Sequence, residues 1–171
     1  MGEETPNIQG SSPATIFIIG KTRSKSLYSY AMWFGNNNPT AYSKLWIDIN
    51  QGGAQEAVFR FAGASVLYNE MFNDQPFIST WAWSDATSES NYNLYVDGVL
   101  QSSSARTSVN SINLINDFFV IGAAFGTGQN CQNYYNGQIS EIIIFNRLLK
   151  NSEREAVEKY LSQKYNIPII H

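Results

Sequence analysis

The sequence contains one cysteine, one histidine and no long apolar stretch, and each scarcity excludes a class of protein. Cys131 alone cannot form a disulfide within the chain. With His171 as the single histidine, a Ser-His-Asp triad and a zinc site built from several Cys and His side chains are both excluded. No apolar run approaches the roughly 18 residues of a membrane-spanning helix, so we expect no such helix.

Charged residues are also few. They make up 15% of the chain, and the formal net charge is −3. No run of Lys or Arg occurs, so the positive surface of a nucleic-acid-binding protein is missing. The start of the chain is polar and acidic and shows no signal peptide. We predict that residues 1–13 are a linker or a remnant of cloning, and that the chain is a domain taken from a larger protein.

Aromatic residues, by contrast, are abundant at 14% and occur together with many Asn, Ser and Gly residues. Aromatic and β-branched side chains favour strands, whereas Asn, Ser and Gly favour turns. A chain of 171 residues is long enough to bury one hydrophobic core. We therefore expect a single all-β domain over residues 14–171.

Apolar alternation between turn residues locates the strands. The ranges that fit a strand are 15–21, 26–34, 44–50, 57–63, 76–83, 117–125 and 138–146, whereas residues 65–72 are ambiguous. Within residues 92–104, Asp97-Gly98 predicts a hairpin with a type I′ turn, because both central residues of that turn need φ > 0. Residues 126–137 have the composition of a long polar and aromatic loop.

The end of the chain has the pattern of one amphipathic helix. Ser152 and Glu155 form a capping box that predicts its start, and Asn166 predicts its end. The side chains expected on its buried face are Val157, Tyr160 and Leu161. About eight to ten strands followed by one helix indicate a two-sheet antiparallel β-sandwich.

The C-terminal stretch also carries a family resemblance. The matching positions are Tyr135, Gly137, Ile139, Glu141 to Ile144, Asn146, Arg147, Leu149, Ser152, Glu153, Arg154, Val157, Tyr160, Leu161, Lys164 and Tyr165. Together with the hairpin sequence LYVDG, they resemble the laminin-G-like jelly rolls of the concanavalin A-like lectin/glucanase superfamily, in their bacterial and phage versions. The resemblance covers roughly residues 14 to 167. It implies a jelly roll with a glycan or protein ligand on the concave face or its rim loops.

Members of this superfamily include lectins, carbohydrate-binding modules, adhesin and tail-fibre domains, and glycosidases, so the fold leaves the function open. A glycosidase needs two carboxylates flanking the scissile bond, about 5 Å apart in retaining enzymes. The laminarinase-type members carry E-x-D-x-x-E on one strand. Glu141 is followed by apolar residues at the corresponding spacing, and Asp48 has no following Glu. We expect His171 to be part of a disordered end or a tag, and we expect no catalytic activity.

Sugar recognition uses aromatic faces and side-chain amides, and three stretches supply them. The candidate ligand-binding residues are Trp33, Asn36 and Asn37 in the first, Trp81 and Trp83 in the second, and Asn130, Asn133 and Tyr134 in the third. Trp81 and Trp83 share a strand face, which is either a stacking platform or core; we favour core for at least one of them. Tyr135 matches a family position that packs before the last strand, so we expect it to be structural.

No cofactor is required by this interpretation, although calcium stays open. Asp85 and Asn91 lie in one loop and are weak calcium candidates, because Ca²⁺ takes oxygen ligands. The same residues are also common in ordinary turns.

Two functional hypotheses follow. The first is a non-catalytic, lectin-like carbohydrate-recognition module of a larger bacterial surface or secreted protein, or of a phage virion protein. It would be extracellular, at a cell surface or on a virion, and its partner a glycan or surface polysaccharide. The alternative is a structural or protein–protein interaction domain, for virion decoration or oligomerisation, without a sugar site. Burial of Trp33, Trp81 and Trp83 would favour the alternative.

Overall fold

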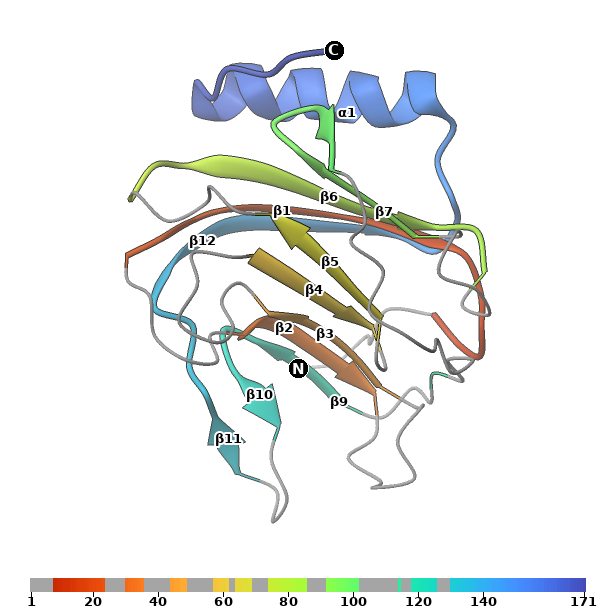
Figure 1. Ribbon diagram of the computed structural model, residues 1–171, viewed down its shortest axis with the longest axis vertical. Coiled ribbons are helices and arrows are strands. Elements are labelled where there is room, and N and C mark those ends of the chain that lie inside the picture. The colour runs from red at the N-terminus through yellow and green to blue at the C-terminus, as the bar shows by residue number, and fades with distance from the viewer. Residues whose placement is uncertain are drawn as a thin grey trace, which may run out of the picture.

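The computed structural model places the chain in two antiparallel sheets, a small hairpin and one helix (Figure 1). The structure describes residues 8–23, 30–35, 44–48, 57–61, 64–68, 74–85, 92–101, 114, 118–125 and 130–171; for residues 44–48, 57–61, 64–68, 118 and 125 it describes the backbone alone. The helix, the first sheet and the second sheet form successive layers.

The first sheet has the strand order β12-β1-β6-β7-β8. Its strands are β1 (Ala14–Thr22), β6 (Phe77–Trp83), β7 (Tyr92–Val96), β8 (Val99–Leu100) and β12 (Gly137–Phe145). The turn between β7 and β8 confirms the predicted hairpin, since Asp97 has φ 49° and Gly98 φ 85°. Asp97 is also tied back to the sheet, because its Oδ1 accepts a hydrogen bond of 2.8 Å from the Ile78 amide.

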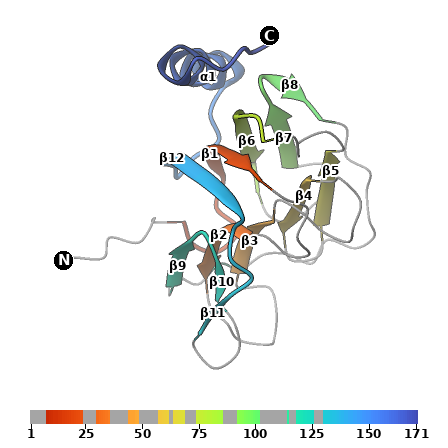
Figure 2. The same cartoon turned by 90° about the vertical axis from the view of Figure 1, so that its left-hand side faces the viewer.

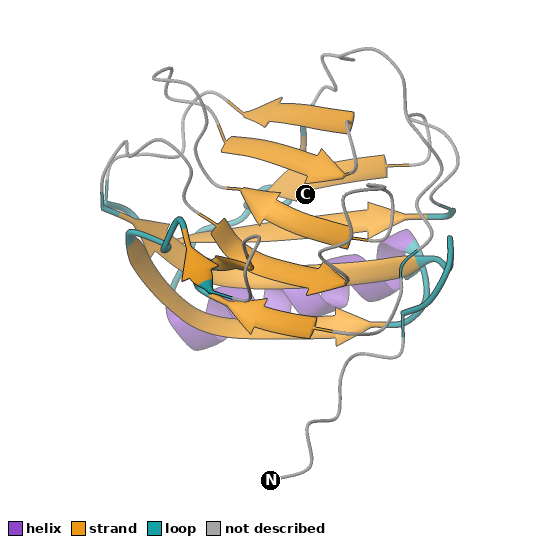
Figure 3. Cartoon of the chain, turned by 90° about the horizontal axis from the view of Figure 1, so that it is seen from below, coloured by secondary structure: helices purple, strands orange, loops and turns teal. Residues whose placement is uncertain are grey.

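The second sheet has the strand order β5-β4-β3-β2-β9. Its strands are β2 (Tyr30–Gly35), β3 (Lys44–Asp48), β4 (Ala57–Phe61), β5 (Ala64–Tyr68) and β9 (Phe118–Ile121). The ambiguous stretch 65–72 therefore contains most of a strand. Figure 3 looks onto this sheet, with the helix behind both sheets. The predicted two-sheet jelly-roll sandwich is confirmed.

The first sheet is buried on both faces. Ile16, Ile18 and Phe34 pack between the two sheets, whereas Phe17 and Ile19 pack on the helix side. Alternate residues of β1 thus enter two different apolar layers. This explains why β1 has an unbroken apolar sequence instead of the alternation of a half-exposed strand.

Trp81 and Trp83 lie in the core between the sheets, and each is 0% exposed. The Trp81 indole donates to Ser79 Oγ (3.0 Å), and the Trp83 indole donates to the Ser12 carbonyl (2.8 Å). The stacking-platform alternative for β6 is therefore wrong, and the core position that we favour for at least one of these residues holds for both. The physical reason is position: β6 is the central strand of the first sheet, so the second sheet covers its inner face.

Residues near the start of the described chain are packed on the domain. Ile8 is 1% exposed, and Gly10 and Leu114 exchange backbone hydrogen bonds of 2.9 Å. The predicted linker 1–13 is therefore wrong for residues 8–12, while residues 1–7 lie outside the described part. The helix that the structure describes is not long and apolar enough to cross a membrane.

Helix α1 (Asn151–Tyr165) starts slightly earlier than its sequence pattern predicts. The capping residue is Lys150, whose amide donates to the Glu153 carboxylate (2.8 Å), and Arg147 adds a bidentate pair to the same carboxylate (2.8 and 2.9 Å). The hydrogen bonds from Arg147 lower the pKa of Glu153 to about 2. The predicted capping box at Ser152 and Glu155 is replaced by this arrangement.

The predicted end of the helix is confirmed, and its predicted buried face is confirmed in part. Asn166 ends it in the left-handed conformation (φ 53°). Leu161 is 0% exposed against the first sheet, but Tyr160 is 53% exposed, so its predicted burial is wrong. Glu141 of β12 accepts hydrogen bonds from Lys164 and Tyr165, both at 3.0 Å from Oε2, and thereby ties β12 to the helix. These contacts give Glu141 a structural role, in line with its lack of a second carboxylate at the catalytic spacing.

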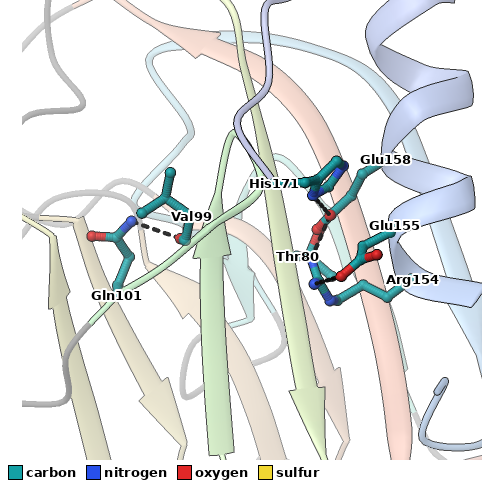
Figure 4. Close-up of polar contacts among 7 residues, drawn as sticks. All are labelled: Thr80, Val99, Gln101, Arg154, Glu155, Glu158 and His171. Carbon is teal, nitrogen blue, oxygen red and sulfur yellow. Dashed lines mark hydrogen bonds and ion pairs between the residues drawn. The ribbon is translucent and has the colours of Figure 1, made fainter. Parts of the chain in front are cut away.

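A buried polar network lies between α1 and the sheet (Figure 4). Glu158, 0% exposed, pairs with Arg154 and accepts a hydrogen bond of 2.6 Å from Thr80. The Arg154 guanidinium also lies 3.8 Å from the centre of the Tyr95 ring. His171 belongs to the same network, with Nδ1 3.7 Å from Glu158 Oε2, so its expected place in a disordered end is wrong.

Removing the Glu158 carboxylate leaves Arg154 buried without its buried charged partner, with the exposed Glu155 carboxylate alone remaining. We expect Glu158→Ala to lower the free energy of unfolding by about 3–5 kcal/mol, measured by chemical denaturation. Glu155→Ala is the matched control on the same helix, because the Glu155 side chain is 45% exposed, and an ion pair whose carboxylate is open to solvent is worth about 1 kcal/mol or less. Equal effects of the two substitutions would contradict this account of the network.

The core assignment of Trp81 makes a separate prediction. Trp81→Ala should cost about 3–5 kcal/mol of stability, because it removes a fully buried ring and leaves a cavity. Tyr160→Ala, which removes an exposed ring, should change stability by about 0.5 kcal/mol or less. Thermal and chemical unfolding of the two variants checks this, and a neutral Trp81→Ala variant would refute the core assignment.

Candidate functional site

One continuous run of exposed polar and aromatic side chains lies at the end of the molecule away from α1. The hairpin formed by β10 (Ala124–Phe125) and β11 (Cys131–Gln132) projects from this end, as Figures 1 and 2 show. Helix α1 covers the outer face of the first sheet over β1 and β6, so this part of the sheet offers no surface for a ligand. The hairpin and the residues after it are the part of the described chain that best fits a recognition site.

Gly122 is the reason that a separate hairpin exists. The apolar stretch 117–125 was predicted as one strand, but Gly122 has φ 76° and divides it into β9 and β10. The Gly122 amide donates to the Ala31 carbonyl (2.9 Å), and its carbonyl accepts from the Tyr135 amide (2.8 Å). The predicted loop 126–137 accordingly contains the second strand of the hairpin, β11.

A small apolar cluster supports the hairpin from below. Trp33 is 6% exposed and packs with Tyr30, Ala124 and Val120. The Tyr30 and Trp33 rings meet edge to face with centroids 6.3 Å apart. The predicted ligand role of Trp33 is therefore wrong, because its ring supports the hairpin instead of facing solvent.

Tyr135 anchors the chain where it leaves the hairpin for β12. Its hydroxyl shares a hydrogen bond of 2.9 Å with Thr22, and burial raises the pKa of its phenol to about 12. A Cβ on Gly137 would lie 2.9 Å from the Tyr135 ring and closer still to the Lys21 carbonyl, so only glycine leaves room there. The side chain of Tyr135 is structural, as the sequence predicts.

Five consecutive residues above this anchor expose their side chains. They are Asn130, Cys131, Gln132, Asn133 and Tyr134. Tyr134 is 67% exposed, and its hydroxyl donates to the Cys131 carbonyl (3.1 Å), which restrains the ring. Asn133 has φ 54°, and its carbonyl accepts from the Tyr30 amide (3.4 Å). The segment is thus held by its backbone and presents amides and a phenol ring to solvent.

Of the predicted ligand residues, Asn130, Asn133 and Tyr134 lie together on this surface, while the three tryptophans do not. Asn36, Asn37 and Asn91 lie outside the described residues. Among the residues that the structure describes, no group of three or more His, Cys, Asp and Glu side chains could hold a metal ion. The calcium site at Asp85 and Asn91 stays a prediction.

One exposed residue beside the hairpin is missed by the sequence pattern. Ile121 closes β9 and is 53% exposed, although the stretch 117–125 reads as a buried strand. The following glycine is the only local signal that the strand could end there.

Comparison with known proteins places this geometry in a wider context. The family model of the concanavalin A-like lectin/glucanases superfamily matches residues 12–153. No curated protein sequence matches the chain.

Several solved structures share the fold. The CBM40 module of the Ruminococcus gnavus IT-sialidase is 16% identical, with a TM-score of 0.64 over 87% of this chain and 84% of that chain. The same module bound to α2,3-sialyllactose has a TM-score of 0.62 at 15% identity, over 87% of this chain and 84% of that one.

A sialidase of Trypanosoma rangeli in complex with sialic acid is 15% identical, with a TM-score of 0.62 over 90% of this chain. This chain corresponds to 23% of that sialidase, so the match is to one part of a much longer protein. At these identities the structures establish a shared fold. The family match over most of the chain shows that it belongs to the concanavalin A-like lectin/glucanase superfamily.

Proposed function

We propose that this chain is a non-catalytic carbohydrate-recognition module and that it binds its glycan on the surface from Asn130 to Tyr134. The observation that carries the proposal is the exposed Tyr134 ring, restrained by its hydrogen bond to Cys131 and flanked by exposed amides. A restrained ring loses little conformational entropy on binding. It offers an apolar face to the C–H groups of a pyranose, while amides exchange hydrogen bonds with its hydroxyls.

The comparisons support the same interpretation. A sialidase module with the same fold binds sialyllactose, at an identity of 15% to this chain. The matches to a module and to one part of a longer sialidase also support a chain that forms part of a larger protein acting outside the cell. A bacterial surface or a phage virion is the setting that we propose for it. Tethering a recognition module to another domain raises the effective concentration of that domain at the glycan.

The hydrogen bonds that Glu141 accepts argue against a hydrolytic function. Its hydrogen bonds from Lys164 and Tyr165 lower the pKa of this carboxyl. A general acid in a glycosidase needs the opposite, a raised pKa, and a second carboxylate facing it. Glu141 is instead used to hold the helix on β12.

The burial of all three candidate tryptophans favours a second function. Trp33, Trp81 and Trp83 are 6%, 0% and 0% exposed, so the chain has no tryptophan platform at these positions. Exposed Tyr and Asn side chains also suit protein recognition. The second candidate is therefore a protein-interaction or oligomerisation domain that uses the same hairpin.

Glycan-array screening followed by calorimetry separates the two functions. We expect the wild-type chain to bind a glycan, and Tyr134→Ala to weaken binding by about tenfold or more through the loss of stacking area. Tyr160→Ala is the matched control, because it removes an exposed tyrosine from the opposite side of the molecule. The measurement is repeated with calcium and with a chelator, which tests the open calcium prediction.

An absence of binding at millimolar sugar, with and without calcium, would contradict the proposal. A stable dimer or trimer in solution under the same conditions would then support the protein-interaction role. Equal losses for Tyr134→Ala and Tyr160→Ala would show that the site has been placed on the wrong surface.

A further inference from the structure

The outer face of the first sheet is open at one corner, beyond the end of the helix layer. Phe17 and Ile19 of β1 pack on the helix side, so the alternation of the strand places Lys21 and Arg23 on the same outer side. Lys21 is half-buried, and Arg23, which directly follows β1, is exposed. The outer surface at this end of β1 is therefore accessible to a ligand.

The start of β12 lies beside this end of β1. Thr22 pairs with Gly137 in the antiparallel ladder between the two strands. The Arg23 amide donates to the Asn136 carbonyl (2.9 Å), so the ladder continues one residue further. Arg23 and Asn136 are therefore cross-strand neighbours, and the side chains of such neighbours lie on the same face of a sheet.

Tyr134 presents its ring on the same face. The hydroxyls of Thr22 and Tyr135 share a hydrogen bond of 2.9 Å, and Tyr135 packs on the core between the sheets, so both side chains point inward. Tyr134 and Asn136 are exposed, whereas Tyr135 between them is half-buried, which is the alternation of an extended segment. Tyr134 is thus a diagonal neighbour of Arg23. In a regular antiparallel pair such neighbours lie about 7–8 Å apart, within reach of long side chains.

The charge of Arg23 has no carboxylate partner among the described residues. The described cations that form ion pairs with carboxylates are Lys21, Arg147, Arg154 and Lys164. The Arg23 guanidinium makes neither an ion pair nor a hydrogen bond within the part of the chain that the structure describes. Its donors are therefore available to an anionic group, and a guanidinium binds carboxylate and sulfate oxygens through two parallel hydrogen bonds.

We propose that Arg23 is the anion-binding residue of the glycan site, and that the ligand is an acidic sugar whose carboxylate or sulfate pairs with it. The sugar ring lies on Tyr134, and the anionic group outside the ring reaches the Arg23 guanidinium on the same face. A single exposed arginine is ordinary on a protein surface, so the position beside Tyr134 is what distinguishes this one. The inference rests on the proposed function and names the ligand class for the same site.

Matched neutral and acidic glycans test the subsite. An array presents the same sugars in three forms, as the neutral sugar, the uronate and the sulfate ester, and calorimetry follows on the set that binds best. We expect the wild type to bind an acidic form at least about threefold more tightly than its neutral counterpart. High salt should reduce this difference, because the pair is exposed to solvent. The uronate and sulfate arms show which anionic group the ligand carries.

Three substitutions assign the preference to one side chain. Arg23→Gln should abolish it, and Arg23→Lys should retain part of it, because the charge remains without the fork of parallel donors. Lys159→Gln is the matched control, since Lys159 is an exposed cation of α1 that forms no ion pair among the described residues. It should leave the preference unchanged. All three variants should keep the thermal midpoint of the wild type, because both positions are exposed.

The possible failures are distinguishable. Equal binding of neutral and acidic forms, a preference that survives Arg23→Gln, or equal losses for Arg23→Gln and Lys159→Gln would overturn the subsite while leaving the proposed function intact. A loss in Arg23→Gln that is the same for neutral and acidic forms would also overturn it, because Arg23 would then not act on the charge of the ligand. An array without any hits would remove both the inference and the proposed function.

Discussion

The packing of α1 on the outer face of the first sheet determines where everything else in this molecule can lie. Phe17, Ile19 and Ile78 of the sheet meet Leu161 of the helix and Ile167 after it in one apolar layer. Within this interface Glu158 pairs with Arg154 of the same helix and accepts a hydrogen bond from Thr80 of β6, so the buried carboxylate links the helix to the sheet. The covered strands β1 and β6 are thereby a structural layer between the helix and the second sheet.

Recognition is consequently shifted to the opposite end, where the hairpin β10–β11 is built on a support of its own. The cluster under the hairpin contains Trp33, and the Tyr135 phenol holds the exit of the chain. Aromatic residues thus have two roles here. Trp33 and Tyr135 pack beneath the hairpin and stiffen it, whereas Tyr134 is exposed to solvent. A stiff base lowers the conformational cost of binding, which is how a small surface can still recognise a ligand.

The sequence was sufficient for elements whose pattern depends on local chemistry. The strand 15–21, the Asp97-Gly98 turn and the Asn166 helix end were all predictable, because period, turn type and left-handed φ are properties of short segments. The burial of Trp81 and Trp83 depends on the second sheet, which no spacing along β6 reveals. Arg154 and Glu158 have the appearance of a solvated ion pair on a helix, and their burial follows only from the approach of β6. At the site, Tyr134 and Asn133 were predictable from composition, whereas Ile121 became apparent only once Gly122 had divided the strand.

Amide-resolved NMR during titration with the tightest-binding glycan of the array tests the central claim, that recognition lies at the hairpin end because α1 covers the other face. The account predicts that the amide shifts change at Asn130, Asn133 and Tyr134 and stay constant along α1. Shift changes confined to α1 and the C-terminal residues that pack on it would contradict the account, since they would place the ligand on the face that the helix is supposed to close.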